Sequence, residues 1–197
     1  MKYLYIILFF LLSFIVFSSK AFSADMKEAY FAGGCFWCME APFEKLDGVQ
    51  AAVSGYAGGE EDSPTYSDVS SGSTGHREAV RVTYDAEIIS YEKLLEVFWK
   101  QIDPTDEGGQ FVDRGFQYTT AIWFVEESEK GLAEKSKSDH EVNGTFGAPI
   151  VTPVLPFTTF HRAEEEHQNY YQTNKLKYKY YRSRSGRDKY LKKIWNK

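Results

Sequence analysis

Both cysteines of the chain lie in one short stretch, FAGGCFWCMEAPF, at residues 31–43. Cys35 and Cys38 are separated by two residues, so a helix that begins at Cys35 places both sulfur atoms on one face, one turn apart. A cysteine at the junction of a strand and a helix faces unpaired amide groups and the positive end of the helix dipole, which favour the nucleophilic thiolate. The pattern therefore predicts a pair of cysteines that carries out redox chemistry.

A structural disulfide and a metal site are weaker interpretations of the same pair. A disulfide that closes so short a loop constrains the unfolded chain least, so it stabilises the fold little. A metal site needs further ligands, but the chain has no second CxxC motif. Its four histidines lie far from Cys35 and Cys38 in the sequence. We therefore expect no metal and no other cofactor.

Two bulky aromatic residues, Phe36 and Trp37, stand between the cysteines. Aromatic residues at the start of a helix normally pack in the core. Beside a nucleophile they could instead form an apolar slot for a small group such as a methyl group. The residues by themselves leave both interpretations open.

The first 24 residues differ from the rest of the chain. A positively charged start precedes an apolar run at residues 3–17, and small residues follow at Ser23 and Ala24. This order is typical of a signal peptide, and the run is short for a membrane span, which needs about 20 residues. We predict a leader at residues 1–24 and export to the periplasm or the cell exterior, with an uncleaved membrane anchor as the alternative.

Residues 25–197 have the composition of one soluble globular domain. The chain is acidic, with 28 acidic and 23 basic residues, so nucleic acid is not an expected partner. The exception is Lys175 to Lys197, which holds ten Lys or Arg residues interleaved with tyrosines. RNA or a membrane surface could bind there. A solvated basic tail that packs on an acidic body through its aromatic residues is the expected structure.

The order of predicted elements indicates an α+β fold. Alternating or short apolar segments predict strands at residues 28–32, 49–56, 78–84 and 119–125, and an edge strand or loop at 151–157. Helical spacing predicts helices at residues 35–46, 90–101, 126–142 and 162–173, of which the second has Ser90 as its N-cap and the first is kinked or begins at Pro42. The long polar stretch 58–76 and the glycine-bearing stretch 103–117 are predicted loops. We expect a single-domain, two-layer sandwich of a mixed sheet and helices, with a ferredoxin-like core.

Six motifs, in this order, resemble peptide methionine sulfoxide reductase A. They are AGGCFWCMEAPF at 32–43, SGYAGG at 54–59, SPTY at 63–66, SGSTGHREAV at 71–80, DRGFQY at 113–118 and FHRAEEEHQNYY at 160–171. The resemblance covers nearly the whole chain after the leader. It implies a monomeric enzyme of protein repair that reduces the S epimer of methionine sulfoxide, free or in oxidised proteins. A thioredoxin-like dithiol protein is the implied reductant.

The resemblance also implies roles for single residues. By position in the motifs, Cys35 matches the attacking cysteine and Glu78 the acid that protonates the sulfoxide oxygen. The residues that match the substrate pocket are Phe36, Trp37, Tyr66, Asp113 and Tyr118. Taken one by one, these residues could equally be packed aromatics, a strand-end acid and a loop cap.

Elementary chemistry supports these roles. A sulfoxide oxygen leaves only after protonation, so a thiolate nucleophile needs a positioned acid. Glu78 can serve near neutral pH only if an apolar pocket raises its pKa. The sequence does not fix the pKa of Cys35, because the helix dipole lowers it whereas apolar neighbours and an ionised Glu78 raise it.

Cys38 marks a departure from much of the family. Many members have a glycine at this position and carry their resolving cysteines in a C-terminal tail, but the tail of this chain has no cysteine. Cys38 is therefore expected to convert a sulfenic acid on Cys35 to a disulfide, which the dithiol protein then reduces.

Two other classes of protein are kept as alternatives. A thioredoxin-like disulfide oxidoreductase also has a CxxC motif where a strand meets a helix, but this motif lacks a proline between its cysteines. A non-enzymatic binding module would rely on the tyrosines and the basic tail. His161 and Glu165 have the i,i+4 spacing of a metal site, but a solvated helix face is expected there, and His76 is expected to be structural.

Overall fold

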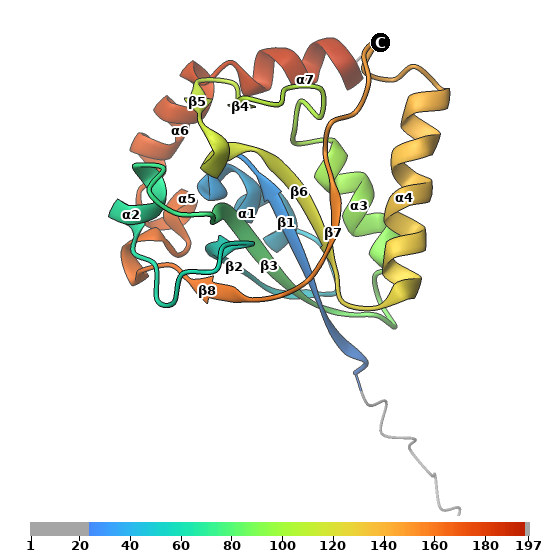
Figure 1. Ribbon diagram of the computed structural model, residues 1–197, viewed down its shortest axis with the longest axis horizontal. Coiled ribbons are helices and arrows are strands. Elements are labelled where there is room, and N and C mark those ends of the chain that lie inside the picture. The colour runs from blue at the N-terminus through green and yellow to red at the C-terminus, as the bar shows by residue number, and fades with distance from the viewer. Residues whose placement is uncertain (1–23, 196–197) are drawn as a thin grey trace, which may run out of the picture.

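The computed structural model of the protein describes residues 24–195, and the predicted leader before Ala24 lies outside this range. The strands are β1 (Met26–Gly33), β2 (Val49–Ala57), β3 (Arg77–Asp85), β4 (Gly109–Gln110), β5 (Asp113–Arg114), β6 (Thr120–Phe124), β7 (Val154–Pro156) and β8 (Phe160–Arg162). The α-helices are α1 (Phe36–Glu44), α2 (Tyr66–Ser70), α3 (Tyr91–Trp99), α4 (Glu127–Val142), α5 (Tyr170–Thr173), α6 (Lys175–Arg184) and α7 (Arg187–Trp195). Two 3-10 helices, η1 (Phe116–Tyr118) and η2 (Glu165–His167), complete the elements, which Figure 1 shows.

One six-stranded sheet runs through the molecule in the order β7-β6-β1-β3-β2-β8. Neighbouring strands are antiparallel, except that β6 and β7 are parallel, so the sheet is mixed. The central four strands, with α1 between β1 and β2 and α3 between β3 and β6, form the β-α-β-β-α-β arrangement of a ferredoxin-like fold. The predicted fold class, a single α+β domain with a mixed sheet, is confirmed.

Both faces of the sheet are covered, and the alternation of residues along the strands explains how. Phe31, Val80 and Ile122 point into the main core, where α1 and α3 supply Met39, Phe43, Leu94, Leu95 and Phe98. The neighbouring residues Tyr30, Ala79 and Trp123 form a smaller cluster on the opposite face. That cluster is covered by Leu155, Phe157 and Phe160 from the strand and loop segments around β7 and β8 rather than by a helix.

The periodic segments lie where the sequence predicted them. The four central strands agree with the prediction to within two residues at each end. Ser90 caps α3 as predicted, because its Oγ accepts a hydrogen bond of 3.3 Å from the Lys93 amide. The segment 151–157 contains β7, which lies at an edge of the sheet.

Pro42 does not mark the start of the first helix, which begins directly after Cys35 and contains Pro42 in its last turn. Because proline has no N–H, the carbonyl of Cys38, four residues earlier, lacks its helical hydrogen bond. Arg182 of α6 replaces the missing donor, with its Nη1 at 3.2 Å from the Cys38 oxygen. The C-terminal segment is thus tied to the back of the CxxC helix.

The predicted helix at 162–173 is wrong. Arg162 ends β8 and pairs with Gly55 of β2, and the remainder forms η2 and α5, which a left-handed residue, Asn169 (φ 51°), separates. The cause lies in β2: Gln168 uses its side chain to bond both the amide (3.1 Å) and the carbonyl (2.9 Å) of Ser54. This contact to another element competes with helix continuation.

The predicted loop at 58–76 contains a short helix, α2, that the prediction omitted. Thr65 and Asp68 form a capping box at its start, with the Asp68 carboxylate accepting from the Thr65 amide at 3.1 Å. His76 closes the loop from inside: its Nδ1 accepts from the Gly59 amide at 3.2 Å and its Nε2 lies 2.9 Å from the Glu61 carbonyl oxygen. This buried position agrees with the structural role expected for His76.

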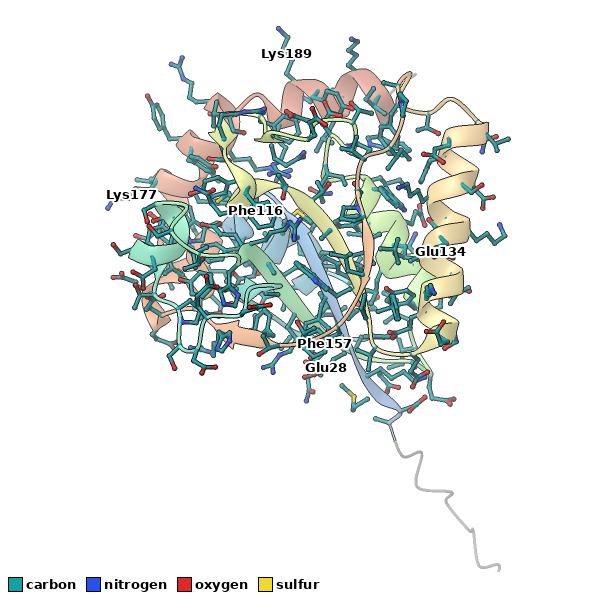
Figure 2. All side chains as sticks on the ribbon, in the orientation of Figure 1. Glu28, Phe116, Glu134, Phe157, Lys177 and Lys189 are labelled. Atoms are coloured by element: carbon teal, nitrogen blue, oxygen red, sulfur yellow. The ribbon has the colours of Figure 1, made fainter. Side chains whose placement is uncertain are left out.

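The basic C-terminal segment forms α6 and α7, which lie at the upper left and along the top edge of the molecule in Figure 1. The lysines of these two helices face solvent, as Lys177 and Lys189 illustrate in Figure 2. Arg187, in contrast, is buried. Within residues 24–195, no helix combines the length and the apolar character needed to cross a membrane.

Candidate active site

The CxxC motif lies at the junction of β1 and α1. Gly34 makes the turn with a φ of +79°, a conformation that favours glycine, and Cys35 is the N-cap residue of α1. The Cys38 amide donates to the Cys35 carbonyl at 3.0 Å, and both thiols are free. Cys35 is 6% exposed whereas Cys38 is 0% exposed, so only the first sulfur borders accessible space.

A small cavity of about 60 Å³ opens at Cys35. Its lining residues come from α1, α2, β3, β5, η1 and α6 and are Cys35, Phe36, Trp37, Tyr66, Glu78, Asp113, Tyr118 and Tyr181. The fold thus brings together seven of the eight site residues that the sequence predicted. Cys38, the eighth, lies behind Cys35 in α1. The volume suits a group of a few heavy atoms and is far below the roughly 300 Å³ at which drug-sized sites begin.

Larger hollows exist on the surface, but none of those found among the described residues is lined by a cysteine. One of about 450 Å³ is lined mostly by glycines and apolar residues near Phe146, at the end of α4, and contains no cysteine. Size therefore does not identify the site here, because a nucleophile and acids converge only at Cys35 within the described part of the chain. Among the described residues, no group of three or more His, Cys, Asp or Glu side chains could hold a metal ion.

Aromatic rings form the walls of the cavity. Phe36 lies 6.2 Å, centroid to centroid, from both Trp37 and Tyr66. Trp37 stacks on Tyr170 of α5 at 3.8 Å with an interplanar angle of 8°, which fixes the indole in place. His167 of η2 backs the same wall, 4.2 Å from the ring of Tyr66. An apolar slot beside the sulfur of Cys35 results.

Glu78 is the carboxyl group of the cavity that touches the CxxC helix. It is the second residue of β3, is 2% exposed, and its Oε2 accepts a hydrogen bond of 2.9 Å from the Phe36 amide. Burial raises the pKa of Glu78 to about 8, even though the bond from Phe36 lowers it. Glu78 therefore carries a proton at neutral pH and can donate it, as the acid role requires.

The phenols of the site also keep their protons. Burial, with the nearby Glu78 carboxyl, raises the pKa of Tyr66 to about 12, and the same causes raise the pKa of Tyr118 above its ordinary value. Asp113 accepts a short hydrogen bond from Tyr181, and burial nevertheless raises the Asp113 pKa. The cavity is thus rich in donors that could face an oxygen atom of a substrate.

The two thiols differ in acidity in a direction that the sequence did not resolve. Burial raises the pKa of Cys35 well above its ordinary value, and a hydrogen bond with Cys38 and the acids Glu78 and Asp113 add to the effect. The amide of Phe36, at the helix N-terminus, is bonded to Glu78 rather than to Cys35. A thiolate at Cys35, which the sequence left open, is therefore not favoured in the substrate-free site.

Three contributors to the site were not predicted. Tyr181 lines the cavity from α6, His167 backs the aromatic wall, and Glu164 accepts from the Tyr56 hydroxyl (2.6 Å) and the Tyr66 amide (2.7 Å). His167 and Glu164 lie inside the FHRAEEEHQNYY motif, which offered a signal. Tyr181 lies in the basic tail, where no spacing pattern connects it to the cysteines.

A partly accessible cysteine beside a neutral carboxyl group, in a slot with aromatic walls, defines a thiol-based reductase of a small polar group. A family model described as peptide methionine sulfoxide reductase matches residues 27–197. Two proteins with the name peptide methionine sulfoxide reductase MsrA are similar over 87% of this chain and 98% of their own length. The protein from Halalkalibacterium halodurans is 52% identical over 172 residues, and that from Bacillus subtilis is 50% identical over 173 residues.

Solved structures agree with the sequence relatives. Reduced Mxr1 from Saccharomyces cerevisiae superimposes with a TM-score of 0.71 at 32% identity, covering 76% of this chain and 86% of that one. Methionine sulfoxide reductase A of Corynebacterium diphtheriae gives a TM-score of 0.69 at 29% identity, covering 77% of this chain and 76% of that one. The chain belongs to the peptide methionine sulfoxide reductase family, as the resemblance of its motifs implied.

Proposed function

We propose that the chain reduces the S epimer of methionine sulfoxide, free or in oxidised proteins, with Cys35 as nucleophile and Glu78 as acid. One observation carries the proposal: a single cavity of about 60 Å³ holds the Cys35 thiol and a buried carboxyl group with a pKa of about 8. The reaction needs both groups, because a nucleophile must attack the sulfoxide sulfur and an acid must protonate the oxygen before its bond to that sulfur breaks.

The size of the cavity suggests how a substrate binds. The methyl group would lie against Phe36 and Trp37, and the hydroxyls of Tyr66 and Tyr118 could donate to the sulfoxide oxygen. The cavity has room for the end of the side chain only, so the backbone of the methionine stays outside. The same site can therefore take free methionine sulfoxide and the residue in a protein.

The steps of the cycle balance in atoms and electrons. The Cys35 thiolate attacks the sulfoxide sulfur and forms a bond to it, while the oxygen takes a proton from Glu78. The hydroxyl group then moves from the methionine sulfur to the Cys35 sulfur. The bonds from the methionine sulfur to oxygen and to Cys35 break, methionine leaves as the thioether with the electron pair, and Cys35 becomes a sulfenic acid. The Cys38 thiolate then attacks the Cys35 sulfur, the S–O bond breaks, and the hydroxide that leaves takes a proton and becomes water. A disulfide between Cys35 and Cys38 results.

A dithiol protein must reduce this disulfide for a further cycle. We propose a thioredoxin-like partner, and the yeast relative Mxr1 has been solved in complex with Trx2. Export of this chain stays a prediction from its leader, which N-terminal sequencing of the mature protein would check. If the chain is exported, its reductant must reach the same compartment.

We expect the chain to turn over the S epimer of a blocked methionine sulfoxide and not the R epimer, with dithiothreitol as reductant. Cys35→Ser should abolish this turnover, because serine lacks a thiolate nucleophile. Steady-state assays on the separated epimers check both points. Turnover of neither epimer, together with active reduction of insulin disulfides, would contradict the proposal and indicate a general disulfide oxidoreductase.

A further inference from the structure

Two arginines of the C-terminal segment contact the CxxC helix and the turn that precedes it. Arg182 donates to the carbonyl of Cys38, the position that Pro42 leaves without a helical donor. Its Nε also pairs with Asp188 at 2.9 Å, so its charge has a partner.

Arg187 is in a different situation. It is 1% exposed, its Nη2 donates to the Gly33 carbonyl at 3.0 Å, and its Nη1 donates to the Gln101 carbonyl. A Cβ atom on Gly34 would lie 3.0 Å from Nη2, so the guanidinium lies directly against the backbone that precedes Cys35.

Within the described range, no carboxylate pairs with this buried charge. None of the ion pairs between residues 24 and 195 includes Arg187, and its Nε has no hydrogen-bond partner there. The Phe111 ring, 4.7 Å from the guanidinium carbon, and the Asp113 carboxyl group, which feels the charge of Arg187, offset part of the cost of burying this cation. No carboxylate contacts the guanidinium directly, so a further negative group nearby would lower that cost.

Several titratable groups share this region: Cys35 and Cys38 in the CxxC motif, Glu78 of β3, Asp113 of β5, and Tyr178, Tyr181 and Arg182 of α6. The phenols stay neutral and Glu78 is protonated. Asp113 accepts a hydrogen bond from Tyr181, and this bond and the charge of Arg187 both favour its ionised form against the effect of burial. Of the two thiols, Cys38 is the one whose charge both arginines favour. A hydrogen bond from Cys35, with Arg187 and Arg182, lowers the pKa of Cys38 to about 7 against the effect of burial.

We propose that Arg187 is a positioning residue that supplies the buried counter-charge for the Cys38 sulfur whenever that sulfur is a thiolate. The inference rests on the proposed function, in which Cys38 is the resolving cysteine. It assigns a task to a basic segment that otherwise looks like a solvated tail.

The counter-charge acts at two steps. In the first, it keeps Cys38 ionised, so that its thiolate can attack the sulfenic sulfur of Cys35. In the second, the reductant thiolate attacks Cys35, which is the more exposed sulfur, and forms a mixed disulfide there. The Cys35–Cys38 bond breaks and its electron pair leaves on Cys38, and a stabilised thiolate is the better leaving group. The second thiol of the reductant then releases Cys35 and becomes oxidised to a disulfide.

The direct test is a titration of the Cys38 thiolate by its ultraviolet absorbance in the Cys35→Ser background, where the serine hydroxyl keeps a hydrogen-bond donor. Arg187→Met should raise the apparent pKa of Cys38 by about one unit or more, because it removes the cation. Arg187→Lys should restore most of the low value. Lys189→Met, two residues further along α7 and exposed, is the matched control and should change nothing (Figure 2). An unchanged pKa in a folded Arg187→Met protein would overturn the proposal.

A second measurement does not depend on the folding of a variant. The oxidised, unmodified chain is mixed with a thioredoxin whose second cysteine is replaced by serine, and the trapped mixed disulfide is located by peptide mass mapping. We expect the adduct on Cys35, and an adduct on Cys38 would overturn the proposal. Neither measurement requires turnover of a sulfoxide, so both remain informative if the proposed function fails its own assay.

Discussion

Replacement of Cys38 by serine limits the enzyme to one turnover. With methionine sulfoxide in excess and a thioredoxin-like dithiol protein as reductant, we expect a burst of about one methionine per enzyme molecule, followed by loss of sustained activity. The reason is geometric: the Cys38 amide bonds to the Cys35 carbonyl one helical turn away, and the described chain holds no other cysteine near the cavity. Without this thiol, the sulfenic acid on Cys35 has no internal partner.

Rapid-quench measurement of methionine, with trapping of the sulfenic acid by dimedone, checks this result. Cys35→Ser is the control, and it should show neither the burst nor the trapped adduct. Sustained turnover of Cys38→Ser with the dithiol protein would rule out Cys38 as the resolving cysteine. The reductant would then have to attack the sulfenic acid of Cys35 directly.

Replacement of Glu78 by glutamine should lower the rate of sulfoxide reduction by about 10²- to 10⁴-fold, the range that a positioned general acid contributes. Glutamine preserves the shape of the side chain and can still accept the hydrogen bond from the Phe36 amide. It cannot transfer a proton to the departing oxygen. Glu134→Gln, an exposed change on α4 far from the cavity, is the matched control and should retain full activity (Figure 2).

The pH dependence separates an acid from a merely structural carboxyl group. Burial raises the pKa of Glu78 to about 8, so the proton is present below that pH and lost above it. The pKa of Cys35 is higher still, so the thiolate fraction of Cys35 rises with pH throughout this range. In the unmodified enzyme, the single-turnover rate should rise with pH and level off near pH 8, where the gain in thiolate is offset by the loss of acid.

Glu78→Gln should remove this break, because the amide has no proton to lose. Its slower rate should continue to rise above about pH 8 with the thiolate fraction. Single-turnover rates from about pH 6 to about pH 10, in roughly half-unit steps, show whether the break in the pH profile disappears in Glu78→Gln. A break near pH 8 that persists in Glu78→Gln would assign the ionisation to another group and argue against Glu78 as the acid.

Local patterns in the sequence specify the scaffold of the site. The period-2 alternation at 78–84 specifies a strand because successive side chains of a strand point to opposite faces. Gly34 followed by the cysteines specifies the turn from β1 into α1, since glycine adopts a positive φ without strain. The segment 162–173 was wrongly predicted as one helix. Its structure depends on contacts with β2, which no local sequence pattern indicates.

Family motifs, rather than spacing, indicated which residues meet at the cavity. Phe36, Tyr66, Glu78 and Tyr118 lie in four separate elements, and each by itself has an ordinary structural explanation. Agreement of several motifs in one order made the joint interpretation specific. In the folded protein these four side chains line one cavity.

The sequence by itself determined that this protein has a CxxC pair at the start of a helix, an α+β fold and the motifs of its family. Only the tertiary structure decided the acidities and the supporting residues: that Glu78 is protonated at neutral pH, that Tyr181 completes the cavity, and that Arg187 lies behind the motif. Backbone preferences depend on a few neighbouring residues, so they can be predicted from the sequence. A pKa shift depends on burial and on charges that folding brings close, so it arises only once the chain has folded. The hydrogen bond that places the Arg187 charge behind the motif joins it to Gly33, 154 residues away in the sequence.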